Sequence, residues 1–131
     1  MAKTRKRNYQ YFYKSKDSGN VWPYIHYNPN RYIDFVVRGT RYCEGLVDYV
    51  GEFKGRLMPE PENESDQNAI RVEHEDGHRI GYVPKEKTQE IRDFKVELPC
   101  ECYCLVERRK DDWGDVCFFA ICYVSEYPVD E

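Results

Sequence analysis

The sequence contains no apolar run of about 18 residues, the length that a membrane-spanning helix needs. The basic N-terminus is not followed by an apolar segment, so we expect no secretory signal and a cytoplasmic or nuclear compartment. The phosphate-binding motifs G-x-x-x-x-G-K-S/T and G-x-G-x-x-G are missing, and so is the nucleophile motif G-x-S-x-G. The sequence therefore predicts no membrane segment, no enzyme and no cofactor.

The sequence also lacks any C-x-x-C pair, although it has six cysteines. Cys100, Cys102 and Cys104 alternate in "CECYC", which places them on one face of a strand, and zinc motifs use wider spacings. His74 and His78 are four residues apart but flank the Asp-Gly turn of a predicted hairpin, where that spacing does not bring two ligands together. We expect buried, reduced cysteines and no metal site.

Charge is distributed unevenly along the chain of 131 residues, whose net charge is −4. Residues 1–41 contain nine Lys/Arg and two Asp, whereas residues 42–131 contain eleven Lys/Arg and twenty-two Asp/Glu. A basic first third suggests an anionic partner. A basic arm that folds onto an acidic body explains the same asymmetry, and charge alone does not separate the two.

Apolar residues that alternate with polar ones predict a mostly β domain. In residues 31–39 the alternation places Ile33, Phe35 and Val37 on one face. Residues 68–83 alternate on both sides of an Asp-Gly turn, which predicts a β-hairpin. Further strands are predicted at 52–59 (interrupted by Gly55), 97–107 and 115–127, with a possible additional strand at 8–13.

The remaining segments predict a helix, a short irregular element and a loop. Pro84 suits the first position of a helix over 84–94, in which Ile91 and Phe94 point inward. Residues 46–51 fit either a strand or a single helical turn. Residues 18–30 contain two prolines among turn-forming residues and predict a loop or a wrapping segment anchored by aromatic residues.

Three segments together resemble the HIRAN domain family: "FVVRGTRYCEG", "GRLMPEPENESDQNAIRV" and "DGHRIGYVPKE". The resemblance covers roughly residues 33–95. It implies a mainly β (α+β) fold with one or two short helices, in the form of a small curved sheet or OB-like β-barrel of about six strands. The expected division is a basic and aromatic extension at 1–30, a single HIRAN-like β domain at 31–127 and a tail at 128–131.

The resemblance also implies a function without catalysis, the binding of single-stranded DNA or of its 3′-hydroxyl end in repair or replication. The matching positions of the end-binding pocket are Arg41, Tyr42, Asn63, Asp66, Tyr82 and Lys85. Arg41 and Lys85 are expected to hold phosphates, and Tyr42 to stack on a base. Asp66 is expected to accept a hydrogen bond from the terminal hydroxyl. Asn63 is expected to contact sugar or base, and Tyr82 to lie near the pocket.

The corner of the chain between Pro59 and Ile70 departs from the family pattern. Where DNA-binding members often have Asn-Pro-Tyr-Asp, this chain has Asn63, Glu64, Ser65 and Asp66, and Pro59 occupies the position of an arginine. A lost stacking ring weakens binding by about 1–3 kcal/mol. A protein-interaction domain that kept the fold and lost the pocket is therefore the alternative. Asn63 and Asp66 are also residue types that cap turns through backbone N–H groups.

Overall fold

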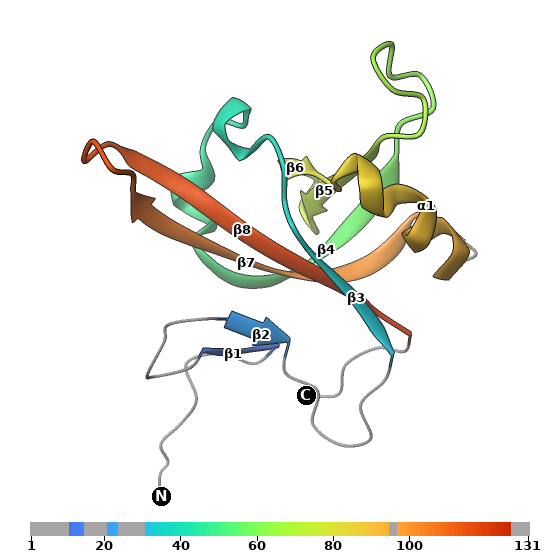
Figure 1. The fold of residues 1–131 in the computed structure, drawn as a ribbon, viewed down its shortest axis with the longest axis horizontal. Helices are drawn as coiled ribbons and strands as arrows, with labels where there is room; N and C mark the ends of the chain where they lie inside the picture. The colour runs from blue at the N-terminus through green and yellow to red at the C-terminus, as the bar shows by residue number, and fades with distance from the viewer. Residues whose placement is uncertain (1–10, 15–20, 24–30, 95–96, 127–131) are drawn as a thin grey trace, which may run out of the picture.

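The computed structural model describes residues 11–14, 21–23, 31–94 and 97–126, and the account below concerns these residues. Six antiparallel strands form one sheet in the order β3-β8-β7-β4-β5-β6, and two short strands pair separately (Figure 1). The sheet strands are β3 (Tyr32–Val36), β4 (Gly51–Pro59), β5 (Ile70–His74), β6 (Arg79–Tyr82), β7 (Cys100–Lys110) and β8 (Val116–Ser125). The other elements are β1 (Phe12–Lys14), β2 (Val21–Pro23), the 3-10 turns η1 (Thr40–Tyr42) and η2 (Leu46–Tyr49), and the helix α1 (Lys85–Phe94). The predicted fold, mainly β with a curled sheet of about six strands, is confirmed.

The sheet curls until its two edge strands meet at one point. An isolated antiparallel bridge joins Arg38, two residues beyond β3, to Tyr82 at the end of β6. The Arg38 N–H donates to the Tyr82 carbonyl, the Tyr82 N–H donates to the Arg38 carbonyl, and both bonds measure 2.8 Å. Gly81 allows this approach, because a Cβ there would lie 2.5 Å from the Arg38 carbonyl oxygen. The bridge gives the curled sheet the character of a partly closed barrel.

The main core lies between the sheet and the helix. Ile33, Phe35 and Val37 all point into it, as their alternation predicts. Ile91 of α1 is fully buried in the same cluster, and Phe94 packs against it. Full burial of one such aliphatic side chain stabilises the fold by about 1.5–3 kcal/mol. The helix is thus held on the sheet by its apolar face.

The opposite face of β7 and β8 is covered by the N-terminal pair of strands (Figure 1). Tyr11 and Phe12 pack against Tyr103, Leu105 and Tyr123, which point away from the main core. The Tyr123 hydroxyl donates to the Tyr11 carbonyl oxygen over 2.9 Å. Part of the predicted extension therefore belongs to the packed structure. A loop or wrapping segment was predicted over 18–30, and the structure corrects this at Val21–Pro23, which form a strand paired with β1.

Two further expectations are corrected. Gly55 does not interrupt its strand, because β4 runs unbroken from Gly51 to Pro59. A Cβ at Gly55 would lie 2.4 Å from the Glu73 carbonyl oxygen, so glycine permits close approach of β5 there. The second correction concerns the cysteines, since Cys117 is exposed rather than buried.

Other expectations are refined by the structure. Residues 46–51 contain the 3-10 turn η2, so the helical alternative holds. His74 and His78 are half-buried, and the His78 ring stacks on Tyr49 with centroids 4.4 Å apart. Among the residues that the structure describes, no helix has the length and apolar character needed to cross a membrane.

Candidate nucleic-acid interface

The polar corner between β4 and β5 is organised by its own side chains. The Asn63 side-chain oxygen accepts hydrogen bonds from the backbone N–H groups of Ser65 (2.9 Å) and Asp66 (3.0 Å). Asp66 Oδ1 accepts one from the Asn68 N–H over 2.9 Å. These are the turn-capping roles that Asn and Asp residues favour. Asn63 and Asp66 therefore shape the corner, and the second carboxylate oxygen of Asp66 is left without a hydrogen bond in the described structure.

Glu60 connects this corner to the strands behind it. Its carboxylate accepts hydrogen bonds from the Asn63 amide (2.9 Å), the Arg71 guanidinium (3.0 Å) and the Tyr82 hydroxyl (3.1 Å). Charged acceptors make stronger hydrogen bonds than neutral ones, so these contacts fix the corner relative to β5 and β6. The role of Glu60 was not predicted, because two of its three partners, Arg71 and Tyr82, lie on the strands that follow the corner.

A pocket of about 380 Å³ opens between the corner, the sheet closure and the start of α1. Four of the six predicted contacts line it: Asn63, Asp66, Tyr82 and Lys85. The other lining residues are Arg38, Ser65, Ala69, Val83, Pro84 and Glu86. The curled sheet brings these segments together, because the bridge between Arg38 and Tyr82 closes the sheet beside the corner.

The two remaining predicted residues lie outside this lining. Arg41 and Tyr42 belong to η1, and Tyr42 is 74 % exposed. Arg38 lines the pocket in their place, three residues before Arg41. The sequence "VVRGTRY" contains both arginines, and it does not show which of them lies at the pocket. The pairing of Arg38 with Tyr82 places Arg38 there.

Charges of both signs surround the pocket. The Arg38 guanidinium lies 3.1 Å from the Glu86 carboxylate, and both side chains are about two-thirds exposed. Such an exposed ion pair stabilises the fold by about 0–1 kcal/mol, so an anion that binds Arg38 more tightly can displace Glu86. Lys85 adds a second exposed cation to the lining, whereas Asp66 contributes a carboxylate.

Tyr82 supplies the aromatic ring of the pocket. Its hydroxyl is tied to Glu60, and the Arg79 guanidinium carbon lies 5.9 Å from the ring centroid. A hydrogen bond from Arg79 to the Tyr82 hydroxyl is the main reason why the pKa of Arg79 is raised. The ring is thus fixed at its hydroxyl end and remains part of the pocket wall.

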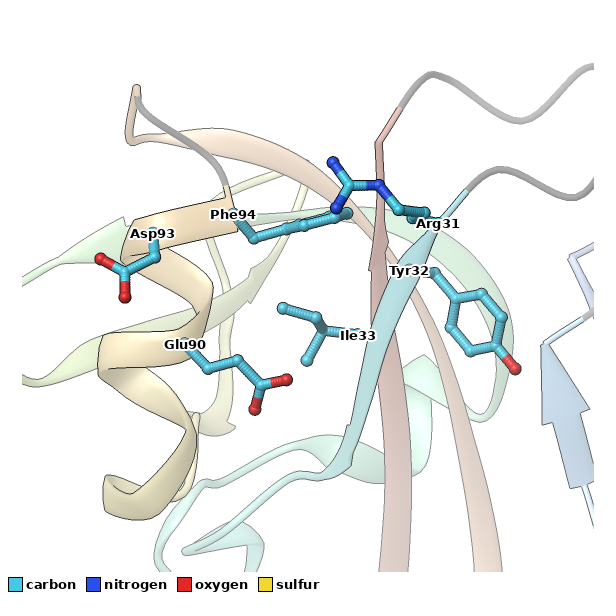
Figure 2. A pocket seen from close by; sticks show the side chains of 6 residues that line it. All are labelled: Arg31, Tyr32, Ile33, Glu90, Asp93 and Phe94. Atoms are coloured by element: carbon cyan, nitrogen blue, oxygen red, sulfur yellow. The ribbon is translucent and has the colours of Figure 1, made fainter.

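A second pocket, of about 590 Å³, lies between the start of β3 and the last turns of α1 (Figure 2). Its charged lining is formed by Glu90 and Asp93 together with Arg31, whose guanidinium lies over the Phe94 ring. Arg31 also pairs with Glu126 over 2.9 Å. The two carboxylates repel phosphate, and Glu126 offsets the charge of the arginine, so this pocket is the poorer candidate for a nucleic acid despite its volume.

A curled antiparallel sheet with a mixed polar and aromatic pocket at its closure defines a small β-barrel-type binding domain. The HIRAN domain family model matches residues 30–94. The chain belongs to the HIRAN domain family, as the resemblance predicts. A HIRAN domain is a binding module rather than a catalytic fold, and the family is known for DNA binding.

Two solved structures are similar to this chain. The crystal structure of the HIRAN domain of human HLTF is 23 % identical, over 70 % of this chain and 74 % of that one, with a TM-score of 0.46. The crystal structure of a protein from Lactobacillus plantarum is 20 % identical, over 72 % of this chain and 97 % of that one, with a TM-score of 0.44. No curated protein matches the chain.

Proposed function

We propose that the chain is a non-catalytic module that binds single-stranded DNA and holds its 3′-hydroxyl end in the pocket at the sheet closure. The observation that supports this most directly is the convergence of Asp66, Tyr82 and Lys85 on one pocket, with Arg38 beside them. These residues come from three separate segments of the chain. The family resemblance implies the first three, and the fold adds Arg38.

Each of these side chains supplies one requirement of strand-end binding. Arg38 and Lys85 neutralise phosphates of the last nucleotides. The Tyr82 ring offers a face for a base or sugar. Asp66 keeps one carboxylate oxygen for the terminal hydroxyl, while its other oxygen holds the turn. A terminal phosphate in place of the hydroxyl is repelled by this carboxylate, which gives the pocket its preference for a 3′-hydroxyl end.

Arg38 should contribute more to DNA binding than Arg41, since only Arg38 lines the pocket. We expect Arg38→Ala to weaken binding of a single-stranded oligonucleotide about tenfold. The slope of log Kd against log salt concentration should also fall, by the amount that corresponds to the loss of roughly one phosphate contact. Arg41→Ala is the matched control, with the same charge change three residues away. Fluorescence anisotropy at several salt concentrations measures both. Equal losses in the two variants contradict the assignment of the pocket.

Removal of the Glu86 charge should strengthen DNA binding. In the unbound protein the Glu86 carboxylate forms an ion pair with the Arg38 guanidinium, and its negative charge repels a phosphate that approaches. We expect Glu86→Gln to lower Kd about two- to fivefold at low salt, which corresponds to the 0–1 kcal/mol of an exposed ion pair. Glu90→Gln, on the same helix but outside the pocket lining, should leave Kd unchanged. The same anisotropy titration compares the two; a Kd that rises in Glu86→Gln contradicts the expectation.

Protein binding is a second candidate function, and the surface of the segment between β3 and β4 favours it. Tyr42, Val47 and Val50 are 74 %, 59 % and 49 % exposed in this segment. Neighbouring exposed apolar side chains are typical of protein contacts. A variant with Tyr42→Ser and Val47→Ser distinguishes the candidates, because it should leave DNA binding at the pocket intact while a partner protein is lost in pull-downs.

A further inference from the structure

Three cysteine thiols meet in the main core, away from the candidate DNA pocket. Cys102 and Cys104 come from β7 and Cys122 comes from β8, directly opposite Cys104 in the strand register. All three are fully buried, and their sulfur atoms all lie within 4.8 Å of one another. The sulfurs of Cys102 and Cys104 are 4.0 Å apart. The cluster therefore presents three soft ligand atoms to one point.

We propose that Cys102, Cys104 and Cys122 form a buried three-sulfur site for a single thiophilic metal ion, with Cu(I) as the ion that fits it best. The claim is independent of the proposed DNA binding, because the three thiols lie in the apolar core cluster and none lines the candidate DNA pocket.

The spacing of the sulfurs suits a metal that they surround in one plane. Metal–sulfur bonds of about 2.3 Å place three such sulfurs about 4.0 Å apart. The observed separations, from 4.0 Å to within 4.8 Å, need only side-chain adjustments to reach this arrangement.

The number of ligands decides which metal the site prefers. Within the described part of the chain, no fourth Cys, His, Asp or Glu belongs to this group. Zinc in structural sites takes four ligands in a tetrahedron. Thiolates select Cu(I), and this ion accepts three sulfur ligands without a fourth. The apolar surroundings also exclude water, which would otherwise complete the shell of a harder ion.

Metal binding at this site exchanges protons for the ion without a change of oxidation state. Each thiol that becomes a thiolate ligand releases its proton to solvent as the Cu–S bond forms. Copper enters and remains as Cu(I).

Cys100 and Gly55 offer a route from the surface to this site. Cys100 lies two residues before Cys102 on the same face of β7, is half-buried, and lines a surface pocket of about 260 Å³ together with Gly55. A Cβ on Gly55 would lie 3.4 Å from the Cys102 sulfur, so the pocket wall at Gly55 lies next to the cluster. An ion held first at Cys100 would enter the cluster from this side.

Titration of the reduced full chain with Cu(I), under anaerobic conditions and in competition with the chelator bicinchoninate, tests the proposal. We expect one tightly bound equivalent. Cys104→Ser should weaken Cu(I) binding at least a hundredfold, whereas Cys117→Ser, at the exposed cysteine outside the cluster, should leave it unchanged. X-ray absorption of the wild-type complex should show three sulfurs at about 2.3 Å from copper.

Several results overturn the proposal. Equal Cu(I) affinity in wild type and Cys104→Ser assigns copper to other thiols, and so does loss of binding in Cys117→Ser. Two sulfurs rather than three in the absorption spectrum of the wild-type complex exclude the site even if Cys104→Ser fails to fold. If one equivalent of Zn(II) binds and Cu(I) does not displace it, the proposed preference of the site for Cu(I) is wrong.

Discussion

Replacement of Gly81 with alanine should lower the free energy of unfolding by about 3 kcal/mol, the upper end for overpacking in a core. A Cβ at this position would lie 2.5 Å from both the Arg38 carbonyl oxygen and Val37 Cγ1, and neither the backbone nor a buried valine can move away freely. Strain at this point separates β6 from the end of β3 and opens the sheet closure. Urea denaturation followed by tryptophan fluorescence measures the change.

Gly77→Ala provides the contrast to Gly81→Ala. Gly77 lies in the hairpin turn at a φ of +95°, and a Cβ there would meet no atom within 4 Å. Its substitution therefore introduces backbone strain alone, of about 1–2 kcal/mol. Gly81→Ala should be the more destabilising of the two and should also weaken DNA binding. A Gly81→Ala protein as stable as wild type contradicts the account of the closure.

Exchange of Asp66 for asparagine should remove most of the preference for a 3′-hydroxyl end. The side-chain oxygen of asparagine can still accept the Asn68 N–H, so the turn is retained, while the charged acceptor for the hydroxyl is lost. A hydrogen bond to a charged group contributes about 1.5–3 kcal/mol, which corresponds to roughly a 10- to 100-fold loss of affinity for the hydroxyl end. Fluorescence anisotropy with 3′-hydroxyl oligonucleotides measures this loss.

Two companion variants separate the charge of Asp66 from its role in the turn. Asp66→Ala removes the turn hydrogen bond as well and should lower stability, by about 1 kcal/mol more than Asp66→Asn. Glu64→Gln removes a carboxylate two residues away that does not line the pocket, and should keep the end preference. If Glu64→Gln and Asp66→Asn change the preference equally, net charge rather than hydroxyl recognition controls binding.

Local sequence patterns were sufficient to predict the elements whose contacts join residues close together in the sequence. Ile33, Phe35 and Val37 reveal β3 by alternation, and the Asp-Gly turn reveals the hairpin of β5 and β6. Pro84 and Ile91 reveal α1 in the same way, because helix starts and apolar faces are encoded within about ten residues. The family resemblance added the expected neighbours of the corner, which hydrophobic periodicity does not reveal.

The pairing of distant strands was not predictable from these patterns. The bridge between Arg38 and Tyr82 joins residues from opposite edges of the sheet, so local patterns did not indicate that Arg38 lines the pocket. The cysteine cluster shows the same limit. "CECYC" indicates that three thiols share a face, whereas the structure joins Cys102 and Cys104 to Cys122 through the register of β7 and β8. Register across long separations depends on tertiary packing.

The comparison of two oligonucleotides that differ only at the 3′ terminus tests the central claim most directly. Anisotropy with wild-type protein should give a Kd at least tenfold lower for a single strand that ends in a 3′-hydroxyl than for the same strand with a 3′-phosphate. The preference should persist at high salt, because a hydrogen bond to Asp66 and close repulsion within the pocket are screened less than contacts along the strand. Equal affinity for the two strands, or no binding to either, contradicts the claim that this pocket holds a DNA end.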